Sequence, residues 1–348
     1  MIEYIKSNIE KVSVHYVGNK TNGGELRLSK SLLDTSDLSV RDLLFKFFLS
    51  PFSDPEFNSF TFSNEDFTLN PIYKYASQIF FEKNTFHECS VNIVKHLYEL
   101  SVHPQIKSGD LFVAFFSDID YNGILVNAIG IFKSENRQAF LKLDSDGNAF
   151  SIRIDDGINI ENLDKGCLVF DIDKDKGYKV CIVDKSNKSS EAQFWKDIFL
   201  QITPCRDEYH QTKDFMNITK SYFTNHMTEE FDVSKTDQID LLNRSVEYFK
   251  THEIYNKQEF ENEILYDTDI INSFRNFEEK FSQENYINIG EEFEISNQAV
   301  KKQARIFKSV LKLDKNFHIY IHGNRNLIEQ GVDERGRKYY KIFYEEES

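Results

Sequence analysis

The sequence has few cysteines, and their spacing suits neither a metal site nor a disulfide framework. Its 348 residues include Cys89, Cys167, Cys181 and Cys205, with no CxxC pair among them. In a chain of this length such scattered cysteines favour buried free thiols. This usage is typical of a reducing cytoplasm, and we expect neither a metal nor a cofactor.

Long hydrophobic runs are also missing. The longest apolar stretches, residues 111–116 and 124–132, fall far short of the roughly 18 residues that a membrane-spanning helix needs. The first residues lack the charged start and apolar run of a secretory signal. We therefore expect a soluble cytoplasmic protein without a membrane partner.

The motifs of familiar enzyme chemistry are absent. GxSxG, GxGxxG and HExxH do not occur, although a triad assembled in space would leave no such motif. Lys20 and Thr21 lie among glycines, but Val14 and Asn19 stand where a phosphate-binding loop requires glycine. Residues 18–24 therefore predict a turn, and we expect a binding protein with no catalytic residues.

One acidic segment superficially resembles a metal site. Asp171, Asp173 and Asp175 alternate like the first ligands of a calcium loop, but Lys176 and Ile182 replace its glycine and its bidentate glutamate. The segment predicts a solvated hairpin tip. A magnesium-dependent nuclease built on these acids is the alternative.

The histidines predict no metal site either. His87 and Cys89 lack further ligands nearby in the sequence, so we expect them to be structural. His318 and His322 are four residues apart, and on an extended strand they would lie about 13 Å from one another. A single ion bound at about 2 Å cannot bridge that distance.

The N-terminal part of the chain mixes strand and helix signals. Residues 12–17 alternate as in a strand, and the glycine-rich turn after them predicts a hairpin with residues 25–28. Asp37 is the expected N-cap of a helix over residues 40–49. The inward residues of that helix are expected to be Leu43, Leu44, Phe47 and Phe48. A second helix begins with the capping-box pattern of Thr85 and Glu88 and ends before Pro104.

Short apolar or alternating runs follow, separated by glycine turns, and they predict an antiparallel meander. They cover residues 111–116, 124–132, 137–143, 150–154, 167–172 and 178–183. Ser189 or Ser190 is the expected cap of a helix through Trp195 and Phe199. Residues 208–281 are helical in composition, and strands return at residues 304–313, 317–321 and 337–344.

These patterns together predict an α+β protein of two domains. Residues 1–189 would form an N-terminal antiparallel sheet with flanking helices. Residues 190–348 would form a helix-rich region closed by a small basic antiparallel sheet. The sequence leaves the oligomeric state open, so a homo-oligomer is compatible with it.

Charge is distributed unevenly along the chain. The net charge is -15 with a pI near 5.1, which opposes attraction of the whole molecule to a polyanion. Residues 301–341 nevertheless contain eleven lysines and arginines against four acids, 11 - 4 = +7, which leaves -15 - 7 = -22 for the remainder. The C-terminal segment is therefore a basic island on an acidic protein.

The last predicted strands place aromatic residues beside these cations. In the strand over residues 317–322, Phe317, Ile319 and Ile321 would face inward, and His318, Tyr320 and His322 outward. Such a face can contact phosphates and stack on bases. The candidate nucleic-acid-binding residues are Lys301, Lys302, Arg305, Lys308, Lys312, His318, Tyr320, His322, Arg325, Arg335, Arg337 and Lys338. An ordinary solvated face, or an intramolecular match for the acidic remainder, is the alternative.

The chain resembles the 37-kDa bacterial nucleoid-associated protein family. The likeness is clearest at residues 109–116 with 124–132, and at residues 317–321 with the hairpin into residues 339–342. It extends over most of the chain, through residues 165–183, Trp195 and the helical stretch. It implies a non-enzymatic role at the bacterial nucleoid in the cytoplasm.

Two routes to the nucleoid stay open. The protein would bind nucleic acid, double-stranded DNA in the first place, through the basic island, or it would be recruited by a DNA-bound protein. The strongly negative total charge departs from what a protein that coats DNA directly would show, and it leaves recruitment through a DNA-bound protein open. A scaffold whose acidic surfaces engage a basic DNA-handling partner is the alternative.

Overall fold

The computed structural model describes residues 2–346 except 54, 64–65, 147–148, 186–192, 286, 306, 308–309 and 322–326. The chain divides into two compact units, unit 1 (Met1–Cys205) and unit 2 (Arg206–Ser348). This division lies beyond residue 189, because Trp195 and Phe199 pack in the core of unit 1. Ser189 and Ser190, the expected helix caps, lie outside the described residues. The fold is α+β, as predicted.

Unit 1 is built on a nine-stranded antiparallel sheet within its described residues. The strand order is β11-β4-β10-β9-β6-β5-β2-β3, and β1 pairs with β5. The strands are β1 (Ile2–Glu3), β2 (Asn8–Val17), β3 (Leu26–Arg27), β4 (Phe57–Phe60), β5 (Gly109–Tyr121), β6 (Ile124–Ser134), β9 (Lys165–Phe170), β10 (Lys179–Asp184) and β11 (Ile202–Pro204). The predicted hairpin of residues 12–17 with 25–28 is confirmed, since β2 pairs with β3.

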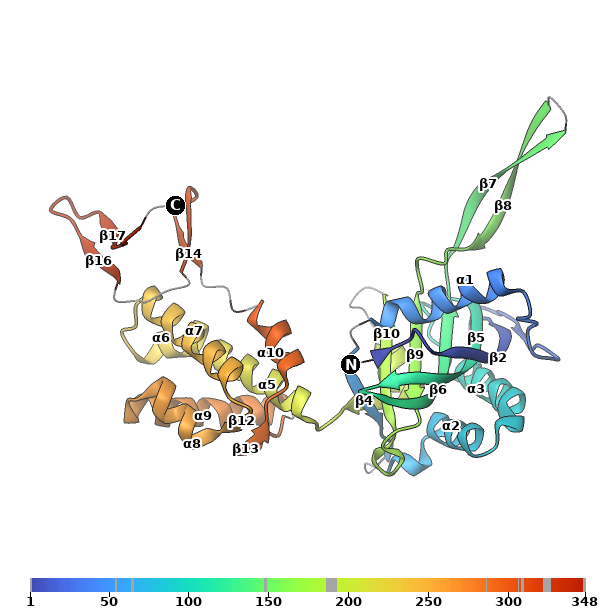
Figure 1. The fold of residues 1–348 in the computed structure, drawn as a ribbon, viewed down its shortest axis with the longest axis horizontal. Helices are drawn as coiled ribbons and strands as arrows, with labels where there is room; N and C mark the ends of the chain where they lie inside the picture. Colours follow the sequence, from blue (N-terminus) through green and yellow to red (C-terminus); the bar gives the residue numbers. More distant parts are fainter. Residues whose placement is uncertain are drawn as a thin grey trace. The chain divides into compact units, whose positions relative to one another are not determined.

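Helices cover both faces of this sheet (Figure 1). They are α1 (Leu38–Leu49), α2 (Pro71–Phe81), α3 (Phe86–Leu100) and the π-helical segment η6 (Phe194–Leu200), with short 3-10 turns η1 (Ser50–Phe52), η3 (Phe67–Leu69), η4 (Lys83–Thr85) and η5 (Lys174–Lys176). Phe112 and Phe116 of β5 face α1, whereas Val113 and Phe115 face α2 and α3. Burial on both faces explains why β5 reads as a continuous apolar run.

Two details of the helix predictions are wrong. Asp37 does cap α1, but Leu43 is 48% exposed because α1 buries only its C-terminal turn, with Phe47 and Phe48. The expected capping box of α3 does not form. Thr85 already closes the turn η4 with near-helical backbone angles, and its hydroxyl donates to the Glu82 carbonyl at 2.8 Å.

The expected simple meander is also wrong at one point, where the chain leaves the sheet between β6 and β9. There β7 (Arg137–Asp146) and β8 (Ala149–Ile158) form a separate two-stranded ribbon, and β9 returns to pair with β6. Figure 1 shows this ribbon standing off from the sheet of unit 1. On one of its faces Arg153 pairs with Asp144 at 3.0 Å.

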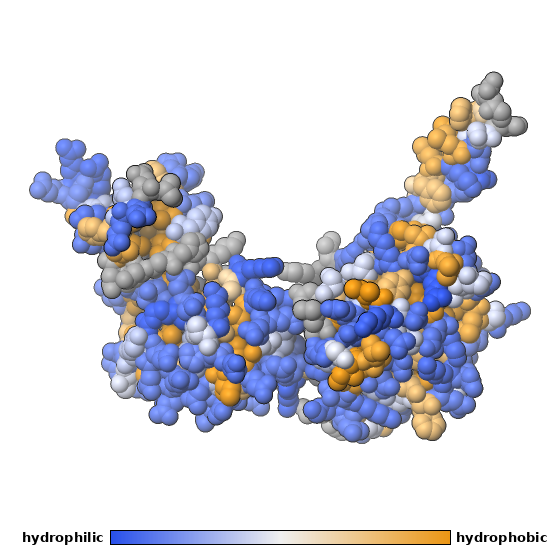
Figure 2. Space-filling view, in the orientation of Figure 1, coloured by the Kyte–Doolittle hydropathy of each residue, from blue (hydrophilic) through white to orange (hydrophobic). Residues whose placement is uncertain are grey.

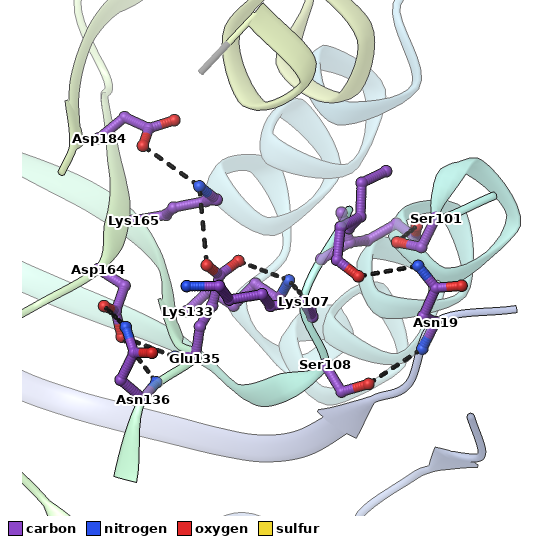
Figure 3. Close-up of polar contacts among 12 residues, drawn as sticks. Asn19, Ser101, Lys107, Ser108, Lys133, Glu135, Asn136, Asp164, Lys165 and Asp184 are labelled. Atoms are coloured by element: carbon purple, nitrogen blue, oxygen red, sulfur yellow. Dashed lines mark hydrogen bonds and ion pairs between the residues drawn. The ribbon is translucent and has the colours of Figure 1, made fainter. Parts of the chain in front are cut away.

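A buried ionic network lies where this ribbon begins (Figure 3). Glu135, just after β6, accepts a hydrogen bond from Lys133 Nζ at 2.8 Å and lies 3.8 Å from Lys165 Nζ. Lys133 also donates to the Lys107 carbonyl at 2.5 Å, and Lys165 pairs with Asp184 at 3.2 Å. The three side chains of Lys133, Glu135 and Lys165 are each at most 3% exposed.

The same junction is fixed by a buried carboxylate. Asp164 accepts hydrogen bonds from the backbone nitrogens of Glu135 and Asn136 and from the Asn136 amide, at 2.6–3.2 Å. Because these bonds satisfy both backbone donors between β6 and β7, the chain leaves the sheet in one defined direction.

Unit 2 packs its helices around an aromatic core. Its helical elements are α5 (Glu208–Ser221), η7 (Tyr222–His226), α6 (Met227–Glu230), α7 (Lys235–Thr251), α8 (Lys257–Phe260), η8 (Glu261–Leu265), α9 (Thr268–Asn285) and α10 (Asn297–Ala304). Two short strands, β12 (Ile254–Asn256) and β13 (Glu292–Glu294), pair between them. The Tyr255 ring lies 4.4 Å from that of Phe215 and 4.6 Å from that of Phe293.

Two hairpins end the described chain, β14 (Val310–Leu313) with β15 (Phe317–Tyr320) and β16 (Ile328–Val332) with β17 (Lys338–Ile342). The predicted strand over residues 304–313 is only partly right, because Ala304 is the last residue of the helix α10 and β14 begins at Val310. Ser296 caps that helix by accepting from the Ala299 nitrogen, a local signal that the strand reading overlooked. None of the helices in the described part of the chain combines the length and apolar character that crossing a bilayer requires.

The buried network predicts a large effect of one neutral substitution. Glu135→Gln leaves Lys133 and Lys165 without the carboxylate they share, and we expect it to lower the free energy of unfolding by about 3 kcal/mol. Urea unfolding of unit 1 measures this. Glu161→Gln is the control, since the exposed pair of Glu161 with Lys46 should contribute less than about 1 kcal/mol. Equal effects of the two substitutions would contradict the prediction.

A second prediction concerns acid sensitivity. His15 is 2% exposed and its Nδ1 accepts from the Ser29 nitrogen, so its Nε2 carries the proton shared with Ser90. Burial, with the stacked His87 adding to it, lowers the pKa of His15 to about 4. The unfolded chain takes up this proton below about pH 6.5, so stability is lost as pH falls from about 6.5 to about 4.

We expect the titration of His15 to remove about 2 kcal/mol of stability between about pH 7 and pH 4.5. His15→Gln should reduce this slope of unfolding free energy against pH, whatever its effect at neutral pH. His103→Gln, at an exposed position, should leave the slope as it is. An unchanged slope in the His15 variant would show that other groups govern acid unfolding.

Candidate nucleic-acid interface

The first candidate cations lie on the helix α10 and directly after it. Lys301 and Arg305 are exposed. Lys302 is half-buried, with its ammonium 5.5 Å from the centre of the Tyr209 ring. Because the Lys302 ammonium packs over an aromatic ring of α5, this side chain also contributes to the stability of the fold. Lys308 lies outside the described residues.

The hairpin β14–β15 has one inward and one outward face. Leu311 and Ile319 form a cross-strand pair that faces the core, while Lys312 and His318 form an exposed pair beside Tyr320. The predicted outward face is therefore present at Lys312, His318 and Tyr320 within the described residues.

Two parts of that prediction turn out differently. Phe317 is 62% exposed instead of inward, because it stands at the turn end of the hairpin, beyond the cluster that covers Ile319 and Ile321. His322 and Arg325 lie outside the described residues.

The hairpin β16–β17 carries the remaining candidates at its turn. Asp333 accepts from the backbone nitrogens of Arg335 and Arg337 at 2.9 and 2.8 Å, and it pairs with the Arg337 guanidinium at 2.8 Å. These bonds lower the pKa of Asp333, the bond from the Arg337 backbone most of all. Arg337 is thus neutralised within the turn, whereas Arg335 and Lys338 are exposed and, among the described residues, form no ion pair.

A small apolar cluster joins the two hairpins to α7. It contains Ile239 of α7, Leu311 and Ile321, each less than 8% exposed, with Ile328 and Tyr340 of the second hairpin packed against them. The Asn243 amide of α7 also donates to the Ile321 carbonyl at 3.2 Å. The outward cations Lys312, Arg335 and Lys338 are therefore carried by hairpins that share one support.

The sequence reasoning about the other candidate sites is largely upheld. Asp173 and Lys174 lie in the turn between β9 and β10, the predicted hairpin tip. The His87 ring forms a hydrogen bond with the Ser13 hydroxyl at 3.0 Å, and the Cys89 thiol is buried. Residues 18–24 form a turn closed by a bond from the Gly18 nitrogen to the Glu25 carbonyl.

One cluster was missed by the sequence reasoning. Among the described residues, His252, Glu259 and Glu263 bring one ligand atom each within 4.8 Å of one another. The His252 Nδ1 bonds the Tyr248 carbonyl at 3.0 Å, and the His252 ring stacks on Tyr248. The four-residue spacing of Glu259 and Glu263 is the available signal in the sequence, but the approach of His252 depends on the turn after α7. Asp171, Asp173 and Asp175 form no such cluster in the described structure.

Comparison with known proteins adds one match. A family model, NA37, described as nucleoid-associated protein YejK, matches residues 13–341, which is nearly the whole chain. No curated protein matches.

The shared support of the hairpins leads to a prediction. Leu311→Ala should remove about 2 kcal/mol from the free energy that keeps β14–β15 closed, because a buried leucine loses both burial and packing. Amide hydrogen exchange should become faster in this hairpin and in β16–β17. Lys312→Ala, an exposed neighbour on the same strand, is the control and should change exchange little. Unaltered exchange in the Leu311 variant would show that the cluster does not hold the hairpins.

Proposed function

This chain belongs to the NA37 family of nucleoid-associated proteins, and from that membership we propose that it is a non-enzymatic protein of the bacterial nucleoid that binds double-stranded DNA through its C-terminal cations. It would act in the cytoplasm, on the nucleoid itself. The observation that carries the proposal is the set of exposed cations on α10, directly after it, and on the two joined hairpins. They are Lys301, Arg305, Lys312, Arg335 and Lys338.

The chemistry of these side chains fits contact with phosphates. Lysine and arginine position a protein on the duplex backbone without reading sequence. Lys312 lies beside His318 and Tyr320, whose rings add hydrogen-bonding and apolar contacts to the sugar and phosphate surface. We therefore expect binding with little sequence preference.

The uneven distribution of charge along the chain determines which region would contact DNA. With +7 on residues 301–341 and -22 elsewhere, a DNA duplex repels most of the surface and attracts one region. The protein would consequently touch DNA with unit 2 and present other surfaces to partners. This arrangement suits a nucleoid protein that connects DNA to a second macromolecule.

The same charge balance supports a second candidate function, an acidic scaffold for a basic DNA-handling protein. Arg337 and Lys341 are already paired with Asp333 and Glu329, which reduces the positive charge available to DNA. Under this reading the protein reaches the nucleoid through its partner, and purified DNA alone does not bind it.

Salt dependence tests direct binding. If the five exposed cations each contact a phosphate, the slope of log affinity against log salt is about -4.5, and affinity falls roughly 500-fold between 50 and 200 mM salt. A gel-shift or fluorescence-anisotropy titration with a duplex of about 30 base pairs measures this slope. Absence of a complex at the lowest salt would favour the scaffold.

Charge reversal locates the contact. The variant Lys312→Glu, Arg335→Glu, Lys338→Glu should flatten the salt slope by about 2.7 and weaken binding at least tenfold at 100 mM salt. Its matched control is Lys30→Glu, Lys74→Glu, Lys95→Glu, which makes the same change in net charge at exposed positions of unit 1. Equal losses in both variants would mean that overall charge, and not the hairpins, governs binding.

A further inference from the structure

The ribbon β7–β8 exposes an apolar face that no described residue of unit 1 covers. Its large side chains are Leu141, Leu143, Phe150, Ile152 and Ile154, which are 64–76% exposed. Apolar side chains gather along this ribbon in the space-filling view (Figure 2). They differ from scattered surface leucines because they are contiguous.

The strand register shows that all five side chains lie on the same side of the ribbon. Leu143 pairs with Ile152, Leu141 pairs with Ile154, and Phe150 pairs with Ser145, in alternate rows of the ladder. Alternate rows of an antiparallel pair point to one face. The three rows on this face contain no charged residue, and Ser145 is their one polar residue, so the face carries an apolar strip.

The opposite face of the ribbon is polar in the corresponding rows. There Lys142 pairs with Arg153 and Asp144 with Ser151. The ribbon is therefore amphipathic, as a strand pair is when one face packs on a core and the other meets water.

The ribbon is anchored firmly at its base. Besides the bonds of Asp164 to the chain between β6 and β7, Arg137 pairs with Asp110 of β5 at 2.7 Å. An isolated two-stranded ribbon is at best marginally stable in water. An anchored ribbon with a strip of this kind gains stability when a second apolar surface covers the strip.

We propose that this apolar strip is a homodimer interface, covered by the same strip of a second copy of the chain. A two-fold axis in the plane of contact sets the central row, Leu143 with Ile152, against the same row of the other copy. The outer rows, Leu141 with Ile154 and Phe150 with Ser145, then meet rows that carry no charge, whichever way the two ribbons run. The surface is thus self-complementary, as an isologous interface requires.

The apolar area of the strip is large enough for a homodimer interface. Burying a leucine, isoleucine or phenylalanine side chain removes about 100 Å² of apolar surface, so five residues supply about 500 Å² per copy. Two copies together bury about 1,000 Å², which reaches the lower end of specific protein interfaces.

Charge argues against nucleic acid as the occupant. From Arg137 to Ile158 the ribbon has three cations, Arg137, Lys142 and Arg153, and four acids, Asp144, Asp146, Asp155 and Asp156, so its net charge is 3 - 4 = -1. A ribbon with this balance offers no electrostatic attraction to phosphates. The inference is independent of the proposed DNA contact, which lies in unit 2.

Sedimentation velocity of the full chain between about 1 and 100 µM tests the proposal. We expect the wild type to be a dimer in this range. Ile152→Lys and, separately, Leu143→Lys place an ammonium group inside the strip and should raise the dimer dissociation constant at least tenfold. The matched control is Ser151→Lys, the neighbouring residue on the opposite face, which adds the same charge and should leave the dimer intact.

Both lysine variants replace residues that are exposed in the single chain, so the fold should survive them, and circular dichroism with thermal melting verifies this. A monomeric wild type over the whole range would overturn the proposal, since the strip would then be covered by another part of the chain or by a different protein. A dimer that persists in both folded variants would overturn it as well, because the contact would lie elsewhere.

Discussion

Two ammonium groups share one carboxylate inside unit 1, and the path of the chain depends on that constraint. Lys133 and Lys165 approach Glu135 from two neighbouring strands of the sheet, where all three side chains are out of water. Removing charges from water is costly unless they are paired closely, so the three side chains hold one another in place. Asp164 then fixes the backbone just beyond Glu135. The position at which the ribbon leaves the sheet is therefore fixed by this junction.

In unit 2, aromatic side chains form the core. In its aromatic core Tyr255 contacts both Phe215 and Phe293, and the two C-terminal hairpins pack on a much smaller cluster around Leu311. The cations on a strongly basic surface repel one another, and the small apolar cluster beneath the hairpins leaves these cations exposed to water. The proposed DNA contact therefore rests on a smaller apolar cluster than the aromatic core of unit 2.

Much of this architecture could be predicted from the sequence, and the failures have physical causes. Local signals were sufficient for the β2–β3 hairpin and for the Asp37 cap of α1. They failed at Thr85 because its backbone already belongs to the preceding turn η4. They also failed at Leu43, because its exposure depends on how α1 packs against the sheet. The alternating pattern of residues 317–321 predicted the outward His318 and Tyr320, but the partnership of Arg337 with Asp333 depends on a turn that charge counting does not describe. The buried lysines gave no local signal, because only the pairing of β6 with β9 brings them together.

The polar face of the β7–β8 ribbon has a consequence for assembly. A flat ribbon that was apolar on both faces could stack without limit, and its free edges could add further strands, as in fibrils. Lys142, Asp144 and Arg153 keep water on one side of the ribbon. In the proposed homodimer these side chains would oppose stacking on the second face, so that association would close after a single partner.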